Sequence, residues 1–485
     1  MQQMSISIQQ ALSWLLFAIL LASLAFPNAS TAQDLTPRER ELMRIIEDLQ
    51  RRVEILERSQ EIRESDEDEH EEQSEDHDQS INDVDPEIDP VPNAGESELR
   101  LYWKEGIRFD SADGKIKLKL FGRIQNDWGW WSVDDGITAA EPGVSSGSGT
   151  EFRRARIGIG GSLYDRYEFK AQFDFAGKDV DFKDVFLAFN SVPYLGQIKI
   201  GHFKEPMGLE VLTSSKDTTF MERAFLALQY AGRNTGIQIA NAEFGERMTW
   251  AAGWFRPVDD SGSGESDGWN LTGRMTGLPY SRDDAHFLHL GLSGRYSDVD
   301  EVFGFSERPE NHFLDRLTSI EVAADSAVTV GSEAALVFGR YSLQGEFGYT
   351  EIDGLMSADD RNVWGYYVQA SAFLTDDNRA YKKSSGAFAK VKPKNNFDWF
   401  GKDGWGAWEV AARWSETDLD MGVSGGGVTV GVNWYLNPNM KIMLNYLHTN
   451  VERPEDLGDP LDADDDVLAF DDDIDAFLTR FQVTW

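Results

Sequence analysis

The stretch YEFKAQFDFA (residues 167–176) alternates strictly between apolar and polar side chains. Its apolar members are Tyr167, Phe169, Ala171, Phe173 and Phe175. Its polar members are Glu168, Lys170, Gln172 and Asp174. Because successive side chains of a strand point to opposite faces, this period of two predicts a β-strand with one apolar and one charged face. The same period recurs in KIKLKL (115–120), VTVGVNWYL (428–436) and DAFLTRFQVTW (475–485).

Such strands fit either a soluble β-sandwich with its apolar faces inward or a transmembrane barrel with its apolar face outward. The connections favour the barrel, because tight ones such as YLNPNMK (435–441) alternate with long polar ones such as VDDGITAAEPGVSSGSGT (133–150). Aromatic residues near strand ends, among them Trp128 and Trp434, are typical of the girdles of such barrels. We therefore predict an all-β antiparallel transmembrane barrel over residues 99–485, with about sixteen strands around a water-filled channel.

The chain begins with a segment typical of secretion. The apolar run ALSWLLFAILLASLAF (11–26) is followed by NASTAQ, whose small residues suit a signal peptidase. We interpret residues 1–32 as a signal peptide cleaved near Ala32. A membrane anchor is the alternative, although the run is short for spanning a bilayer.

Residues 33–98 contain two further parts. Residues 33–63 predict a coiled-coil helix that self-associates as a dimer or a trimer, because apolar residues recur at heptad spacing. These seam residues are Leu42, Ile46, Leu49, Val53 and Leu56. Residues 64–98 contain 16 Asp and Glu residues and no Lys or Arg, which predicts an extended, disordered linker.

Composition excludes several classes of protein. The absence of cysteine excludes disulfides, zinc-thiolate sites and cysteine nucleophiles. The net charge of −38 argues against a nucleic-acid partner. We find no G-x-S-x-G elbow and no pair of histidines at metal-binding helical spacing, so we expect no enzyme activity and no cofactor. The acidic run DPLDADDDVLAFDDDID (459–475) lacks the glycine and distal glutamate of an EF-hand, so we expect no metal site.

Several longer stretches resemble the phosphate-selective porin O/P family over nearly all of residues 100–485. They are FRRARIGIGGSLYDRYEFKAQFDF (152–175), GQIKIGHFKEPMGLEVLTSSKDTTFMER (196–223), GRNTGIQIA (232–240), EAALVFGRYSLQGEF (333–347) and DDDIDAFLTRFQVTW (471–485). The resemblance implies a homotrimeric, sixteen-stranded barrel in the outer membrane, with a third loop folded into the pore and basic residues along an anion path. Phe481 and Trp485 resemble the aromatic C-terminal signal that the barrel assembly machinery reads.

The resemblance also assigns a role to a loop over residues 204–232, which interrupts the strand pattern. In phosphate-selective members, serines, a lysine and an arginine of this loop contact the anion. Ser214, Ser215 and Arg223 match the serine and arginine positions. Hydroxyl groups and a guanidinium fork are suitable partners for phosphate.

Two positions depart from the family pattern. Val211 stands where the loop lysine is expected, although Lys204 and Lys216 lie nearby in the sequence. Glu168 stands where phosphate-selective members carry a basic luminal residue. Both departures weaken an expectation of phosphate specificity more than an expectation of a porin.

The polar faces of the early strands carry a basic track that would line an anion pore. Its members are Lys115, Lys117, Lys119, Arg123, Arg154, Arg156, Lys170 and Lys199. The alternative is that luminal charges of both signs pair with one another, since Glu168, Asp174 and Glu409 are expected to face inward too.

We therefore predict a passive outer-membrane channel for small anions, with phosphate or polyphosphate as candidates and with outer-membrane lipid around the barrel. The first alternative is a non-selective or cation-preferring porin. The second is a structural barrel that the coiled coil tethers to a cell-wall layer.

Overall fold

The computed structural model describes residues 99–485 except 142, 178, 229, 231, 259–267, 356–359, 401–403 and 455–468. The predicted signal peptide, coiled coil and acidic linker lie outside the described residues. Within this part of the chain, none of the helices is long and apolar enough to cross a membrane.

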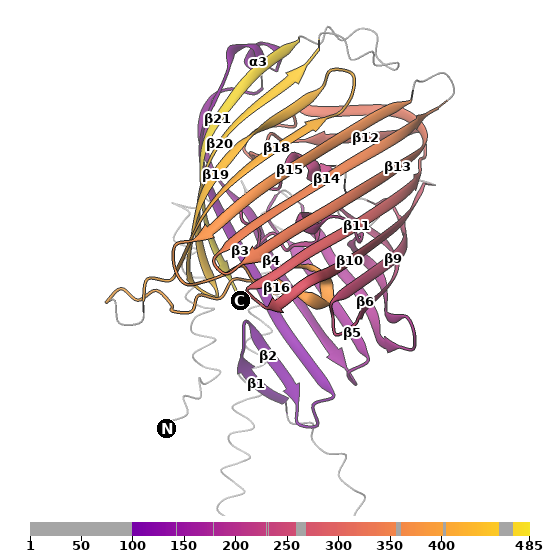
Figure 1. The fold of residues 1–485 in the computed structure, drawn as a ribbon, viewed down its shortest axis with the longest axis vertical. Helices are drawn as coiled ribbons and strands as arrows, with labels where there is room; N and C mark the ends of the chain where they lie inside the picture. The colour runs from indigo at the N-terminus through magenta and orange to yellow at the C-terminus, as the bar shows by residue number, and fades with distance from the viewer. Residues whose placement is uncertain are drawn as a thin grey trace, which may run out of the picture. The chain divides into compact units, whose positions relative to one another are not determined.

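The strands form one antiparallel sheet that closes into a barrel (Figure 1). Sixteen of the sheet's 19 strands build the wall, each paired with the next along the chain, and β21 closes the barrel by pairing with β3. The predicted fold and strand number are confirmed. The wall strands are β3 (Ile116–Val133), β4 (Gly147–Leu163), β5 (Tyr167–Asp174), β6 (Asp181–Val192), β7 (Gly196–Lys204), β8 (Arg233–Glu243), β9 (Met248–Arg256), β10 (Trp269–Asp283), β11 (His286–Asp298), β13 (Thr318–Phe338), β14 (Tyr341–Gly354), β15 (Arg361–Phe373), β18 (Ala407–Asp418), β19 (Ser424–Asn437), β20 (Met440–Arg453) and β21 (Phe470–Thr484).

The remaining elements lie at the two ends of the barrel or inside it. The hairpin of β1 and β2 extends the sheet beside β3, at the opposite end of the barrel from α3 (Figure 1). Strand β12 pairs with the first part of β13, which explains why the alternating SIEVAAD segment extends that strand. These elements are β1 (Leu99–Trp103), β2 (Ile107–Ser111), α3 (Asp135–Ala140), α4 (Leu209–Leu212), η1 (Phe225–Leu228), β12 (Val302–Glu307), β16 (Tyr381–Lys382), η2 (Lys383–Ser385) and β17 (Ala387–Phe388).

The faces of the wall follow the alternation of the sequence. On β14 the apolar side chains of Leu343 and Phe347 are exposed on the outer face, while Gln344 and Glu346 between them are buried. This is the inverse of a soluble protein, because the outer face of a membrane barrel contacts lipid and the inner face contacts water or polar groups. Exposed apolar side chains therefore belong to the design of the wall rather than to a defect in packing.

The connections differ at the two ends. The first wall strand, β3, begins at the same rim of the barrel at which the last wall strand, β21, ends. In barrels of this kind this rim faces the periplasm. Six of the connections at this rim are tight, but β15 and β18 are joined by residues 374–406, which we call the periplasmic insert. The predicted alternation of tight and long connections is wrong at this position. Parts of the insert pack inside the barrel, since Ala387 and Phe388 are buried against Leu209 and Phe287.

Candidate functional site

Residues 205–232, between β7 and β8, form an inner loop that packs against one side of the wall. The backbone N–H groups of Leu209 and Glu210 donate to the carboxylate of Glu346 on β14, each at 2.7 Å. The Met221 N–H donates to the side chain of Asn445 on β20 at 2.9 Å. An irregular loop is tolerated inside a barrel because protein and water satisfy its backbone groups.

Apolar packing seats the inner loop as well. Met207, Leu209 and Phe225 are fully buried, and each buried side chain of this size contributes roughly 1.5–3 kcal/mol. The chain turns into α4 at Gly208, which has φ = +74°. A Cβ at Gly208 would lie 2.4 Å from the ring of Tyr230, so both the conformation and the space require glycine here.

Ion pairs with little exposure to solvent connect the inner loop to the wall. Glu222 accepts hydrogen bonds from Arg153 at 2.9 and 3.0 Å and from Arg480 at 2.7 Å. Arg480 is fully buried and also forms a forked pair with Asp127, at 2.6 and 2.7 Å. A forked guanidinium–carboxylate pair fixes orientation as well as distance. The loop is therefore held in one position inside the barrel.

A second buried group joins the inner loop to the outer connection between β11 and β13. Arg413 on β18 pairs with Glu310 of that connection and lies 3.5 Å from Glu210 of the inner loop. Its Nη1 also donates to the carbonyl of Glu222 at 3.1 Å, and its guanidinium lies 4.6 Å from the ring centre of Phe220. One arginine thus holds two inward-folded segments.

The two loop carboxyls respond differently to burial. Burial raises the pKa of Glu210 above its ordinary value, because Arg413 and the other opposing charges compensate it only in part. Burial also acts to raise the pKa of Glu222, but Arg153, Arg154 and Arg480 outweigh that effect and hold its pKa well below the usual range. Glu222 is therefore an ionised anchor, whereas Glu210 is the more easily protonated group.

Between the inner loop and the wall strands β3–β9 lies a cavity of about 750 Å³. Ten basic residues and two acidic residues line it. The basic residues are Arg123, Arg154, Arg156, Lys170, Lys199, Lys204, Arg223, Arg233, Arg274 and Lys382. The acidic residues are Glu168 and Asp184. This excess of basic over acidic residues gives the partly enclosed space a positive electrostatic potential.

Half of these basic residues have acidic partners. Asp184 accepts from Lys170 at 2.5 Å and from Arg233 at 2.8 Å, and Arg156 pairs with Asp174 at 2.6 Å. Five others form no ion pair with any described residue. These five are Arg123, Lys199, Lys204, Arg223 and Lys382. Among the described residues, no direct ion pair offsets these five side chains, although Arg123, Lys204 and Arg223 donate hydrogen bonds to the inner loop.

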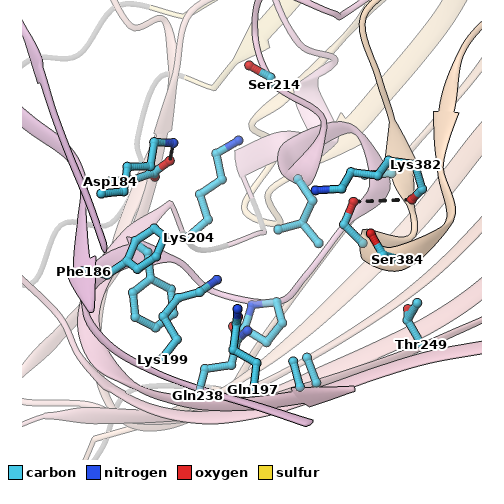
Figure 2. A pocket seen from close by; sticks show the side chains of 18 of the residues that line it. Asp184, Phe186, Gln197, Lys199, Lys204, Ser214, Gln238, Thr249, Lys382 and Ser384 are labelled. Carbon is cyan, nitrogen blue, oxygen red and sulfur yellow. Dashed lines mark hydrogen bonds and ion pairs between the residues drawn. The ribbon is translucent and has the colours of Figure 1, made fainter. Parts of the chain in front are cut away.

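The lysines approach the cavity from two sides (Figure 2). Lys199 and Lys204 rise from β7, and Lys382 reaches in from the periplasmic insert on the opposite side. The ammonium of Lys199 lies 4.9 Å from the ring centres of both Phe186 and Phe203, which orient it by cation–π contact. Such placement leaves these ammonium groups facing the cavity.

The two loop serines lie beside an arginine of the wall. Arg123 Nη1 donates to Ser215 Oγ at 2.9 Å, and Arg123 Nη2 donates to Ser214 Oγ at 3.4 Å. Arg223 lines the same cavity and donates to backbone carbonyls of the loop, including that of Thr213 at 3.1 Å. The arrangement presents two hydroxyl groups and two guanidinium groups to one space.

The two departures from the family pattern differ in their surroundings. Val211 is buried among Met207, Tyr230 and Tyr367, so its side chain does not face the cavity. Its carbonyl accepts a hydrogen bond from the Lys204 ammonium, which places that charge next to position 211. Glu168 lines the cavity and adds a negative charge there.

Other members of the predicted site lie elsewhere. Lys115 and Lys117 are exposed at the periplasmic rim and pair with Asp113 and Asp165. Lys119 lies 5.9 Å from the ring centre of Phe121, outside the lining of the main cavity.

Two further groups of predicted residues lie apart from the main cavity. Lys216 lines a separate small cavity with Lys390 and Lys441. Phe481 is exposed on the outer face of β21, and Trp485 pairs with Gly122 of β3 at the barrel seam through two backbone hydrogen bonds of 3.1 Å.

The sequence prediction missed the contribution of the periplasmic insert. Arg274 on β10 donates to the carbonyls of Ser385 at 3.3 Å and Gly386 at 2.7 Å, and His289 bonds Tyr381 at 2.7 Å. These contacts hold Lys382 at the cavity. The available signal was the basic run YKKSSGAFAKVKPK (381–394), which has too many lysines for a simple turn.

A closed sixteen-stranded barrel with a charged, water-accessible interior and inward-folded segments is the architecture of an outer-membrane porin. The family model "Phosphate-selective porin O and P" matches residues 119–485, and the chain belongs to this family. It is therefore an outer-membrane channel protein and not an enzyme.

Individual relatives match about three quarters of this chain and nearly all of their own length. Porin O of Pseudomonas aeruginosa is 26% identical over 428 residues, which cover 78% of this chain and 91% of that protein. Among solved structures, the anion-selective porin from Comamonas acidovorans has a TM-score of 0.48 at 13% identity, covering 76% of this chain and 100% of that one. OmpT of Vibrio cholerae has a TM-score of 0.48 at 12% identity, covering 76% and 98%.

Proposed function

We propose that this porin is a passive diffusion channel selective for small anions, with oxyanions of the phosphate class as its preferred solutes. The observation that carries the proposal is the cavity lined by ten basic and two acidic residues. An anion entering this space exchanges part of its hydration for ammonium, guanidinium and hydroxyl groups, while a cation is repelled. The gradient of the solute supplies the driving force.

Phosphate preference is supported by the types of donor in the cavity. Arg123 and Arg223 place positively charged guanidinium groups at the cavity, and Ser214 and Ser215, which accept from Arg123, keep hydroxyl hydrogens that can donate to phosphate oxygens. Such donors suit a tetrahedral oxyanion better than a halide. Lys204, beside the carbonyl of Val211, supplies a charge near the position of the missing loop lysine. The description of the matched family, phosphate-selective porin O and P, points the same way.

We further propose a homotrimer as the working assembly. The family resemblance implies it, and one solved form of OmpT of Vibrio cholerae is described as a trimer. Native mass spectrometry of the purified channel in detergent would give three chains per particle. A purely monomeric spectrum would contradict this part of the proposal.

The function is tested by single-channel recording in planar bilayers. Across a KCl gradient, the reversal potential is expected to report anion selectivity, and added phosphate is expected to block the chloride current. The double variant Ser214→Ala, Ser215→Ala is expected to weaken phosphate block by about tenfold, because each lost hydroxyl removes a hydrogen bond of roughly 0.5–1.5 kcal/mol. Cation selectivity would overturn the anion channel, whereas block that survives the double variant would overturn the phosphate site alone.

The variant Val211→Lys restores the lysine that the family pattern has at this position, but we expect it not to strengthen phosphate binding. Position 211 is buried among apolar side chains, so a lysine there would be an uncompensated charge costing about 3 kcal/mol in the free energy of unfolding. We expect no tighter phosphate block and a lower unfolding temperature, measured by heating before gel electrophoresis. Val211→Ile is the control and should leave both unchanged. A tighter block with unchanged stability would show that the side chain reaches the cavity.

Chloride current is expected to fall as the pH rises from about 7 to 9, over the range set by Lys390. Burial, with Lys216 nearby, lowers the pKa of Lys390 to about 8. This lysine is therefore charged at pH 7 and mostly neutral at pH 9, and its loss of charge weakens attraction of anions near the periplasmic mouth. Conductance measured against pH should show this step, and Lys390→Gln should make it smaller. A step of unchanged size in the variant would assign it to another group.

The lowered pKa of Lys390 also makes the free energy of unfolding depend on pH. The unfolded chain binds its proton up to the ordinary pKa of 10.5, whereas the folded chain releases it near 8. Folded-state stability from this group therefore rises with pH between those values. A chemical denaturation series at pH 8 and pH 10 should show a larger increase in wild type than in Lys390→Gln.

A further inference from the structure

The far end of the periplasmic insert carries large aromatic side chains that no part of the described chain covers. Trp399 and Phe400 are each 85% exposed, and Trp405 is 70% exposed. We call residues 397–400 and 404–405 the aromatic tip. Large aromatic side chains are seldom left exposed to water as a group. Such an exposed apolar patch usually marks a surface that contacts a partner or a membrane.

The aromatic tip is continuous with the outer face of the barrel. Ring centres of Trp399 and Phe397 are 5.0 Å apart, and those of Phe397 and Trp434 are 4.9 Å apart. Trp434 in turn stacks on Trp408 at 4.9 Å. These last two tryptophans face outward on β19 and β18, since they alternate with the buried, inward Tyr435 and Glu409.

Backbone contacts hold the base of the tip against the rim. The Phe397 N–H donates to the carbonyl of Leu436 on β19 at 2.7 Å, and the Asp398 N–H donates to Gly404 at 3.1 Å. The indole N–H groups of Trp408 and Trp434 both donate to the carbonyl of Trp405, at 3.2 and 2.9 Å. The tip is therefore held beside the lipid-facing wall at its periplasmic end.

We propose that the aromatic tip inserts into the periplasmic leaflet of the outer membrane. Outward faces of membrane-barrel strands such as β18 and β19 are suited to contact lipid, and the ladder of rings extends this apolar face onto the insert. Tryptophan is favoured at the level of the lipid headgroups, where its ring is buried and its N–H stays hydrated. The surrounding leaflet thus covers the rings that the protein leaves exposed.

When the aromatic tip enters the leaflet, the periplasmic insert is held at two places, one inside the barrel and one outside it. One part packs inside the barrel, where Phe388 is buried and Lys382 lines the cavity. The other part is anchored in the leaflet by Trp399 and Phe400. The membrane thereby helps to position a segment that contributes charge to the channel.

The chain's lack of cysteine makes a direct test available. A spin label on Phe400→Cys is examined in vesicles of phosphatidylethanolamine and phosphatidylglycerol, by comparing relaxation by oxygen with relaxation by a water-soluble nickel complex. We expect oxygen to dominate at position 400. A label on Lys394→Cys, an exposed residue of the same segment, is the control and should respond mainly to nickel.

Two results would overturn the proposal. Nickel access at position 400 equal to that at position 394 would place the tip in water. A label shielded from both reagents would place the tip against another protein or another copy of this chain. Trp399→Cys provides a second labelled position if Phe400→Cys does not assemble, with heat-dependent gel mobility as the check that the barrel has folded.

Discussion

A channel carrying both Lys199→Glu and Lys382→Glu is expected to lose at least about tenfold of its preference for anions over cations in dilute salt. These lysines approach the cavity from the wall and from the periplasmic insert, and neither forms an ion pair with a described residue (Figure 2). An ion passing within about 4 Å of a unit charge gains or loses roughly 1 kcal/mol even in water. Two reversals therefore change the energy of a passing ion by several times thermal energy.

The matched control places the same change of charge outside the cavity. Lys115→Glu and Lys117→Glu alter two exposed residues at the periplasmic rim. Reversal potentials in a KCl gradient would be measured for both double variants, and we expect a large shift in the first and a small one in the second. Equal shifts would mean that total charge near the channel, rather than the cavity lining, sets selectivity.

Much of the barrel could be predicted from the sequence, because membrane strands impose a strict rule on each position. Lipid excludes charge from one face, so the alternation in β5 predicts correctly that Lys170 and Gln172 face inward. The strand number followed from the same pattern. The insert between β15 and β18 was missed because its residues obey neither the strand period nor the expectation of tight periplasmic turns.

The site was harder to predict for a physical reason. The alternation of a strand states which face a charge is on, but it does not state which other charge it meets. Arg413 and Glu310 are 103 residues apart, and Arg480 and Asp127 are 353 apart, yet each pair is buried together. Whether a luminal lysine is paired or free therefore depends on the closure of the barrel and on the loops inside it, which the local sequence does not specify.

Arg413→Met is expected to lower the free energy of unfolding by about 3–5 kcal/mol, because removing one partner leaves buried carboxylates unpaired. Arg413 is 2% exposed and contacts Glu310, Glu210 and the carbonyl of Glu222. The inner loop would lose an attachment to β18, so we also expect a larger and noisier single-channel current. Unfolding in guanidinium and bilayer recording would measure the two effects on the same preparation.

Two further variants separate the buried network from a general loss of arginine. Arg316→Met removes an exposed arginine whose Nη1 donates to the carbonyl of Ser306, and it should change the unfolding free energy by less than about 0.5 kcal/mol. Adding Glu310→Gln to Arg413→Met should restore part of the lost stability, since it removes the unpaired charge. If Arg413→Met were instead as stable as wild type with an unchanged current, the apolar packing of the inner loop and its other polar contacts with the wall would suffice to hold it without Arg413.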